Sequence, residues 1–339
     1  DFEVLVDGKS LVHHKTWRTT DTRNFFEVEK GKEYKIEIRW AHIPTYNASI
    51  KVNIGVENPV DYDALIAKLN GIETVIFAGG ISAGLEGEEM PIDLPGFIGG
   101  DRTDIELPAV QRQFLKKLHE AGKKVVFVNF SGSAMALLPE TESCDAILQA
   151  WYPGEEGGQA VADVLYGDYN PSGKLPVTFY KSTSQLPDFK DYSMKGRTYR
   201  YMTEDPLFCF GYGLSYTNFS IGQASLSKTT LQAGDAKDKI VLSVPVTNTG
   251  KRDGTEVVQV YVKRSADAAG PRKSLRGYAR VNVKAGAEQV AEITLDAESF
   301  ESFDANSNSM QVLPGDYEVF YGNSSADKDL KCVEVKVGK

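Results

Sequence analysis

Acidic side chains concentrate in one stretch of the chain, residues 79–107. Its charged residues are Glu86, Glu88, Glu89, Asp93, Asp101, Arg102, Asp104 and Glu106. The first three glutamates stand beside glycines, whose freedom lets a carboxylate reach into a cleft as a general acid or base. The alternative is a solvated acidic loop. The spacing is not that of a calcium-binding loop, so we predict no metal and no cofactor.

Two further segments place polar or aromatic residues directly after apolar runs. Trp151 and Tyr152 follow the run 146–150, where an exposed ring would suit the CH face of a sugar, although aromatic pairs are more often core. Residues 129–133, Asn-Phe-Ser-Gly-Ser, form a turn similar to a phosphate cradle. Because the full glycine motifs of nucleotide-binding loops are missing, a plain helix cap is favoured.

The elements that position these residues fall into three regions. Up to about residue 56, apolar and polar residues alternate, which predicts a half-buried antiparallel sheet. The alternating apolar residues are Tyr34, Ile36, Ile38, Trp40, Ile50, Val52, Ile54 and Val56. The run 1–6 ends at the turn signal Asp7-Gly8, which predicts that the given sequence begins within a strand. We therefore expect the chain to be part of something longer.

From Pro59 onward, helical spacing alternates with short buried strands. Strands are predicted at 73–78, 124–129 and 146–150, and helices at 61–69, at 108–122, near Ala134 and around 160–165. This order predicts an α/β sandwich domain with a mainly parallel sheet. Ligands of such sheets bind beyond the carboxyl ends of the strands, where all three segments described above fall.

Beyond Tyr216 the helical spacing disappears. Apolar residues recur at every second position over 240–246, 258–262, 281–283 and 333–337, with turn residues at 248–250 and 314–316. About seven short strands in this pattern predict an immunoglobulin-like β-sandwich. The fold class is thus multidomain, α/β plus all-β: a partial β module over 1–57, an α/β domain over 58–224 and the sandwich over 225–339.

Charge and composition exclude several classes of partner. Asp and Glu number 47 against 38 Lys and Arg, a formal net charge of -9 that disfavours nucleic acid and anionic membrane surfaces. No apolar run reaches the ~20 residues that a membrane-spanning helix needs. Cys144, Cys209 and Cys332 lie too far apart in sequence for a metal box or a disulfide framework. A neutral or weakly charged ligand fits best.

Several motifs occur in the order found in the second domain of glycoside hydrolase family 3. They are the run 80–89 (Gly-Ile-Ser-Ala-Gly-Leu-Glu-Gly-Glu-Glu), Gly-Asp-Arg at 100–102, Trp-Tyr-Pro-Gly-Glu-Glu-Gly-Gly at 151–158, Asn-Pro-Ser-Gly-Lys-Leu-Pro at 170–176 and Phe-Gly-Tyr-Gly-Leu-Ser-Tyr at 210–216. The chain resembles this family over about 59–219. The tail resembles a fibronectin type III-like domain, and the opening segment resembles half of a protective-antigen-type β module.

The resemblance implies a retaining β-glycosidase of the β-xylosidase or β-glucosidase kind, hydrolysing terminal non-reducing β-linked sugars in polysaccharide breakdown. Such enzymes pair a nucleophilic aspartate with a glutamate acid/base, ~5–5.5 Å apart. In the family the nucleophile comes from an N-terminal barrel, which this sequence lacks. The barrel is therefore the expected partner of this chain, besides an oligosaccharide or glycoside substrate, and the chain alone is expected to be inactive.

The family's acid/base glutamate stands shortly before an Asp-Arg pair, which carries the role to Glu88, with Glu86 and Glu89 as alternatives. Residues 90–100 intervene here, so the choice within the cluster stays open. The resemblance also implies substrate contacts for Arg102, Trp151 and Tyr152, and a periplasmic or secreted location.

A non-catalytic carbohydrate-binding or scaffold protein is the alternative function, with the β domains and Trp151-Tyr152 holding carbohydrate. Oligosaccharide binding by the chain alone would favour it. A nucleotide-binding α/β protein is disfavoured by the incomplete glycine motifs. The sequence does not specify xylose, glucose or arabinose, and it leaves the oligomeric state open.

Overall fold

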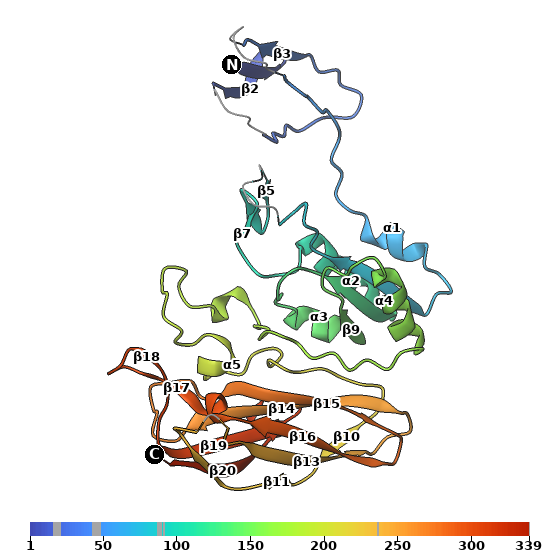
Figure 1. The fold of residues 1–339 in the computed structure, drawn as a ribbon. Helices are drawn as coiled ribbons and strands as arrows, with labels where there is room; N and C mark the ends of the chain where they lie inside the picture. Colours follow the sequence, from blue (N-terminus) through green and yellow to red (C-terminus); the bar gives the residue numbers. More distant parts are fainter. Residues whose placement is uncertain (16–21, 43–48, 87–89, 91, 236, 339) are drawn as a thin grey trace. The chain divides into compact units, whose positions relative to one another are not determined.

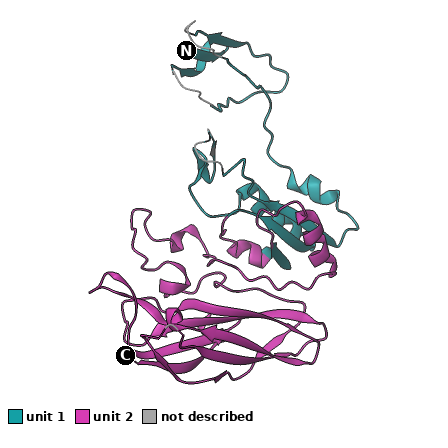
Figure 2. Ribbon diagram, in the orientation of Figure 1, with its two compact units in different colours: residues 1–132, 143–148 teal, residues 133–142, 149–339 magenta. Residues whose placement is uncertain are grey.

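The structure is a computed structural model that describes residues 1–15, 22–42, 49–86, 90, 92–235 and 237–338. The chain forms two compact units, which Figure 2 shows in different colours. The first consists of residues 1–132 and 143–148, and the second of residues 133–142 and 149–339.

The first unit opens with a three-stranded antiparallel sheet. Its strands are β1 (Phe2–Val6), β2 (Lys9–His14) and β3 (Ile36–Trp40), in the order β2-β1-β3. The predicted strand over 50–56 is wrong: these residues have no regular structure, and Ile54 and Val56 are exposed. Alternation makes a strand only where a neighbour supplies backbone hydrogen bonds, and among the described residues none pairs with this segment.

A parallel pair of strands carries the α/β part of this unit. β4 (Thr74–Gly80) and β8 (Lys124–Phe130) pair in parallel, and β9 (Ala146–Gln149) extends the order to β4-β8-β9. Asp61 caps α1 (Tyr62–Ala67) by accepting from Ala64 N, as its residue type predicts. α2 (Ala109–Glu120) buries Leu115 and Leu118, and Phe77 of β4 contacts the rings of Phe114 and Phe127.

The second unit begins with short helices. α3 (Leu138–Ser143) starts later than the helix predicted near Ala134, because Pro139 suits only the first turn of a helix; residues 135–137 are buried and not helical. α4 (Gly157–Tyr166) ends at Gly167, which has a φ of 82°. The 3₁₀ turn η1 (Thr183–Gln185) and α5 (Thr198–Tyr201) follow.

Residues 219–338 form a β-sandwich (Figure 1). One sheet has the order β10-β13-β11, with β16 also paired to β13, and the other has the order β12-β20-β19-β14-β15. The strands of the first sheet are β10 (Phe219–Ile221), β11 (Ser225–Leu226), β13 (Ile240–Asn248) and β16 (Glu288–Leu295). Those of the second are β12 (Thr230–Gln232), β14 (Gly254–Arg264), β15 (Ser274–Val283), β19 (Gly315–Gly322) and β20 (Leu330–Gly338).

The sandwich core follows the predicted alternation. Ile240, Leu242, Val244 and Val246 of β13 are all fully buried, each stabilising the fold by roughly 1.5–3 kcal/mol. The sandwich also carries the hairpin β17 (Glu301–Asp304) to β18 (Ser309–Val312) and the turns η2 (Ala297–Phe300) and η3 (Asp327–Asp329). Across the described ranges, no helix has the length and apolar content to cross a membrane.

Candidate active site

The acidic stretch leaves β4 through two glycines at which no side chain fits. A Cβ on Gly79 would lie 2.3 Å from the Phe77 ring. A Cβ on Gly80 would lie 2.0 Å from the carbonyl oxygen of Phe130, and the φ of Gly80 is +121°, a conformation that L side chains rarely adopt. These two residues therefore fix the direction in which the segment 81–107, here called the acidic loop, leaves the sheet.

Gln111 on α2 holds the same point of the chain. Its Nε2 donates to the Gly80 carbonyl at 2.7 Å, and the Gly80 N–H donates to its Oε1 at 2.8 Å. Beside it, the N–H of the buried Ile81 donates to the Phe130 carbonyl at 2.8 Å. Because both ends of the Gln111 amide are used, the acidic loop starts from a rigid base.

The middle of the acidic loop has regular structure. β5 (Asp93–Leu94), β6 (Phe97–Ile98) and β7 (Asp101–Arg102) form a small antiparallel sheet in that order, and Phe97 is buried beneath it. From β7, Arg102 Nε donates to the Asp104 carbonyl at 3.1 Å, and its Nη2 donates to the Glu106 carbonyl at 3.4 Å. Arg102 thus holds the backbone of the returning segment.

Two carboxylates of the returning segment 103–107 also make contacts that stabilise the acidic loop. Asp104 Oδ1 accepts from the Glu106 N–H at 2.9 Å, and Glu106 Oε2 pairs with Arg112 Nη1 of α2 at 3.0 Å. Both acids are therefore engaged in holding the loop, and of the predicted cluster they are the weakest candidates for proton transfer.

Arg102 also brings the two sides of the acidic loop together. Its Nη1 lies 3.7 Å from Glu86 Oε1, which is an ion pair but longer than a hydrogen bond. Glu88 and Glu89 lie outside the described residues. The structure thus places Arg102 beside one of the three predicted glutamates, and the choice of Glu88 as acid/base stays a prediction.

Trp151 and Tyr152, the other predicted site residues, belong to the second unit. Trp151 has a φ of 59°, which is rare for a bulky residue, and its ring meets that of the buried Phe179 edge-on at 6.0 Å. Such strained positions cluster at functional sites. Tyr152 is exposed. Because Trp151 and Arg102 lie in different units, their convergence on one ligand stays a prediction.

The remaining sequence candidates do not form a site. The predicted helix cap at 129–133 is wrong: α3 begins only at Leu138, and Asn129 and Ser131 are buried, with Asn129 Nδ2 donating to Ser131 Oγ at 3.3 Å. Within the part of the chain that the structure describes, no three His, Cys, Asp or Glu side chains gather closely enough to hold a metal ion.

Sequence reasoning gave no positioning role to Gln111 or Gly79, and it quoted Gly80 only within the family motif 80–89. Two glycines at the end of an apolar strand are a readable signal for close backbone approach. The pairing of Gln111 with Gly80 spans 31 residues and has no local signal.

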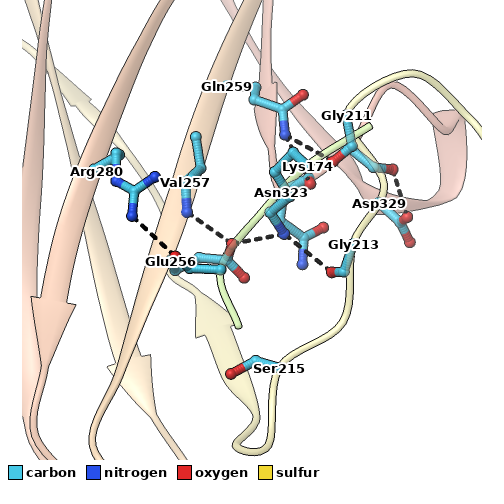
Figure 3. Close-up of polar contacts among 12 residues, drawn as sticks. Lys174, Gly211, Gly213, Ser215, Glu256, Val257, Gln259, Arg280, Asn323 and Asp329 are labelled. Atoms are coloured by element: carbon cyan, nitrogen blue, oxygen red, sulfur yellow. Dashed lines mark hydrogen bonds and ion pairs between the residues drawn. The ribbon is translucent and has the colours of Figure 1, made fainter. Parts of the chain in front are cut away.

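A second polar cluster, here called the seam, joins the segment 170–215 to the β-sandwich (Figure 3). Its members are Lys174, Gly211, Gly213, Glu256, Gln259 and Asn323. Lys174 Nζ lies 2.8 Å from Glu256 Oε1 and donates to the Gly213 carbonyl at 3.2 Å. Gln259 Nε2 donates to the carbonyls of Gly211 and Asn323 at 3.0 and 2.9 Å. The seam therefore ties residues distant in sequence into one body.

Aromatic rings continue the seam. The ring of Tyr199, from α5, stacks on Phe210 at 4.5 Å and meets Tyr261 of β14 edge-on at 5.6 Å. The Leu275 N–H donates to Tyr199 Oη at 3.0 Å. The stretch 195–201 therefore packs against the sandwich through Tyr199.

Tyr261 shows that the contact between Tyr199, Phe210 and the sandwich excludes water. Burial, followed by the neighbouring Tyr199 and Cys209, raises the pKa of Tyr261 far above its ordinary value. Its hydroxyl therefore stays protonated at physiological pH and donates to Gln259 Oε1 at 2.5 Å.

The folds of the two units and the site define a protein class. One unit carries an acidic loop anchored at the end of a strand of a parallel sheet. The other carries a β-sandwich that a polar seam ties to the segment 170–215. Residues 29–216 match the Glycosyl hydrolase family 3 C-terminal domain, and residues 256–325 match the Fibronectin type III-like domain. The chain belongs to glycosyl hydrolase family 3. This confirms the family and the fold class predicted from the motifs.

Two curated relatives and one solved structure illustrate the similarity. The chain is 56% identical over 330 residues to the xylan 1,4-beta-xylosidase of Xylanibacter ruminicola, covering 97% of this chain and 38% of the relative. It is 40% identical over 238 residues to the periplasmic beta-glucosidase of Salmonella typhimurium, covering 66% and 31%. The β-glucosidase of Listeria innocua in complex with gluconolactone superposes with a TM-score of 0.67 at 31% identity, covering 82% and 38%. The chain thus spans less than half the length of each.

Proposed function

We propose that this chain is the C-terminal part of a retaining β-glycosidase of the β-xylosidase or β-glucosidase type, acting on terminal non-reducing β-linked sugars. The observation that carries the proposal is the acidic loop, anchored at the end of β4 by Gly80 and Gln111 and braced by Arg102, in a member of glycosyl hydrolase family 3. An anchored loop can hold a proton-transferring group in register with a substrate.

In this proposal Glu88 is the general acid/base, and an aspartate on an upstream barrel domain is the nucleophile. The aspartate attacks the anomeric carbon while Glu88 gives its proton to the departing glycosidic oxygen, which leaves a glycosyl-enzyme. The Glu88 carboxylate then takes a proton from the water that attacks the anomeric carbon, and the aspartate is released. Glu86, which lies beside Arg102, and Glu89 are the alternatives for the acid/base.

Substrate contacts are proposed for Trp151, Tyr152 and Arg102. The strained backbone of Trp151 supports a role for its ring, because the aromatic face suits the CH face of a sugar. Arg102 is proposed to orient the acidic loop and a sugar hydroxyl together. A periplasmic or extracellular location is proposed, in line with the periplasmic relative.

The test uses a polypeptide that carries this sequence together with its own upstream region. Turnover of aryl β-xylosides and aryl β-glucosides is compared between wild type and Glu88→Ala. We expect a loss of about 10²–10⁴-fold, the range of general acid–base catalysis, with partial rescue by azide as a substitute nucleophile. The present chain alone is expected to show no turnover.

Glu86→Ala and Glu89→Ala are the matched controls, because they remove neighbouring carboxylates of the same loop. Azide rescue confined to one of the three variants identifies the acid/base. Wild-type rates in all three would refute the assignment of the acidic loop to catalysis, and turnover by the present chain alone would place the nucleophile within it.

A further inference from the structure

Two consecutive residues of α2 hold the two stems of the acidic loop, Gly80 and Glu106. At the first stem, Gln111 accepts from the Gly80 N–H at 2.8 Å and donates to the Gly80 carbonyl at 2.7 Å. At the second, Arg112 Nη1 pairs with Glu106 Oε2 at 3.0 Å. All three glutamates proposed for the acid/base lie between these stems in the sequence, so each of them is carried by a segment that α2 holds at both ends.

The helix α2 can serve as a fixed reference because it is attached to the sheet independently of the loop. It packs against β4 and β8, and it buries Leu115 and Leu118 completely. The Phe114 ring meets the Phe77 ring of β4 edge-on at 5.8 Å. Because this ring contact lies outside the acidic loop, we expect α2 to stay in place when a stem contact is lost.

The carboxamide of Gln111 suits the first stem in a way that few side chains match. β4 is the outer strand in the order β4-β8-β9, and at Gly80 its N–H and carbonyl are both bound by Gln111. A carboxamide offers a donor and an acceptor at the same end, whereas an ionised carboxylate offers acceptors only and a thioether only a weak acceptor. Gln111 therefore makes the two hydrogen bonds that a neighbouring strand would make, at the point where the loop begins.

We propose that Gln111 and Arg112 are positioning residues for proton transfer, which set where the acidic loop holds its acid/base relative to the scissile glycosidic bond. The proposal rests on the proposed function. Both side chains act through the loop and not by contact with the sugar. Misplacement by about 1 Å can cost ~10²-fold in rate, so loss of a stem contact weakens protonation of the departing oxygen and leaves the nucleophile in place.

The choice of leaving group separates a misplaced acid from a poorly folded protein. Dinitrophenolate is a weak base and departs without a proton, whereas the oxygen of a methyl glycoside needs a proton as its bond to the anomeric carbon breaks. In a retaining enzyme, kcat/KM reports the steps up to the glycosyl-enzyme. A misplaced acid therefore lowers kcat/KM for the methyl glycoside selectively, and a smaller folded fraction lowers kcat/KM for both substrates equally.

The test uses the longer polypeptide of the proposed function and the substitution Gln111→Met, which keeps the side-chain length and removes the paired hydrogen bonds. For the methyl β-glycoside of xylose or glucose, we expect kcat/KM to fall about 10–10²-fold, and for the dinitrophenyl β-glycoside by less than about threefold. Arg112→Met should show the same pattern with a smaller loss, because its ion pair is partly exposed.

Gln111→Glu is the second variant and covers the case in which Gln111→Met fails to fold. Its carboxylate still accepts from the Gly80 N–H but opposes the Gly80 carbonyl, so the same selective loss is expected. Gln113→Met is the matched control, since it makes the same substitution on an exposed side chain of α2 and should leave both values of kcat/KM unchanged. Equal losses on the two substrates, or no loss on either, would overturn the proposal.

Failure of the proposed function gives a different result. Glu86→Ala, Glu88→Ala and Glu89→Ala are measured on the same two substrates. If none of them lowers kcat/KM selectively for the methyl glycoside, the acidic loop does not carry the acid, and the proposed function fails together with the positioning role. If one of them does and the Gln111 variants do not, only the positioning role is refuted.

Discussion

The seam and the acidic loop both bury charged groups, but they use them differently. In the seam, Lys174 and Glu256 meet at 2.8 Å with 13% and 6% of their side chains exposed. In the acidic loop, Arg102 Nη1 lies 3.7 Å from Glu86 Oε1, and Arg102 Nε and Nη2 donate to backbone carbonyls. Lys174 thus makes its close contact with a buried carboxylate, whereas Arg102 makes close contacts with the backbone of its own loop.

This difference matches what each region has to do. A short buried ion pair with backbone partners selects one arrangement of two segments, because any other leaves a charge unpaired in a dry environment. A loop that delivers a carboxylate to a substrate needs a fixed backbone. The catalytic carboxylate itself must not be used in the contacts that hold the loop. The anchors of the acidic loop at Gly80, Gln111 and Arg102 provide the fixed backbone.

The largest expected effect is on the base of the acidic loop. Gly80→Ala places a Cβ 2.0 Å from the Phe130 carbonyl, at a φ suited to glycine, so it should cost about 2–5 kcal/mol through steric overlap and backbone strain. Hydrogen–deuterium exchange across 74–107 should rise, and the urea transition of the first unit should move to lower concentration.

Gly84→Ala is the control for this change, because its Cβ would meet only Ser82 Oγ at 3.6 Å. It should leave exchange in the loop unchanged. Equal effects of the two substitutions would show that the end of β4 does not hold the loop.

A second, comparable effect is expected in the seam. Lys174→Met leaves Glu256 buried without its cation and should cost about 3–5 kcal/mol. Replacing both residues with methionine removes the stranded charge and should recover most of the loss. Exchange in β14 and in the segment 170–176 reports both variants.

Lys263→Met supplies the contrast, since Lys263 pairs with Glu318 at 3.8 Å in a partly exposed position. Its cost should stay below about 1 kcal/mol. If the double variant in the seam were as unstable as Lys174→Met alone, the stranded charge would not be the cause.

The inward-facing residues of the sandwich strands were predictable from the sequence, because apolar residues recur at every second position along each strand. Ile240 to Val246 step by two and lie inward, and Leu115 and Leu118 lie on the buried stripe of α2. The same rule failed over 50–56, where the spacing is present but no neighbouring strand pairs with it in the described ranges. Apolar periodicity predicts which face of a segment is buried only where a neighbouring strand or helix packs against that segment.

The supports of the site were much less predictable. The seam pairs Lys174 with Glu256, and Gln111 reaches back to Gly80, so both contacts depend on how separate elements pack. Motif resemblance named the acidic loop without saying what holds it. The domain boundaries at 57/58 and 224/225, and the choice of Glu88, stay predictions.

The smallest expected effect on stability concerns Asp327, whose ion pairs are partly exposed and contrast with the buried pair of the seam. Asp327 pairs with Arg272 Nη2 at 2.7 Å and contacts the buried Lys273. Partial burial works to raise the pKa of Asp327, but the hydrogen bond and charge of Lys273, together with Arg272, outweigh it and hold the pKa below its ordinary value.

Because the folded-state pKa is lowered, this pair stabilises the fold above the unfolded pKa of about 3.9, and its contribution is lost as the pH falls through the lower, folded value. Asp327→Asn should cost about 1 kcal/mol or less at pH 7, because the asparagine amide keeps an oxygen that accepts from the buried Lys273 and because Asp327 itself is largely exposed. The difference from wild type should shrink towards pH 3 and also in 1 M salt, where exposed pairs are screened. If the difference in unfolding free energy between wild type and Asp327→Asn grew on acidification, the Asp327 carboxylate would be destabilising. The ion pairs of Asp327 would then not stabilise the sandwich as the Lys174–Glu256 pair is expected to stabilise the seam.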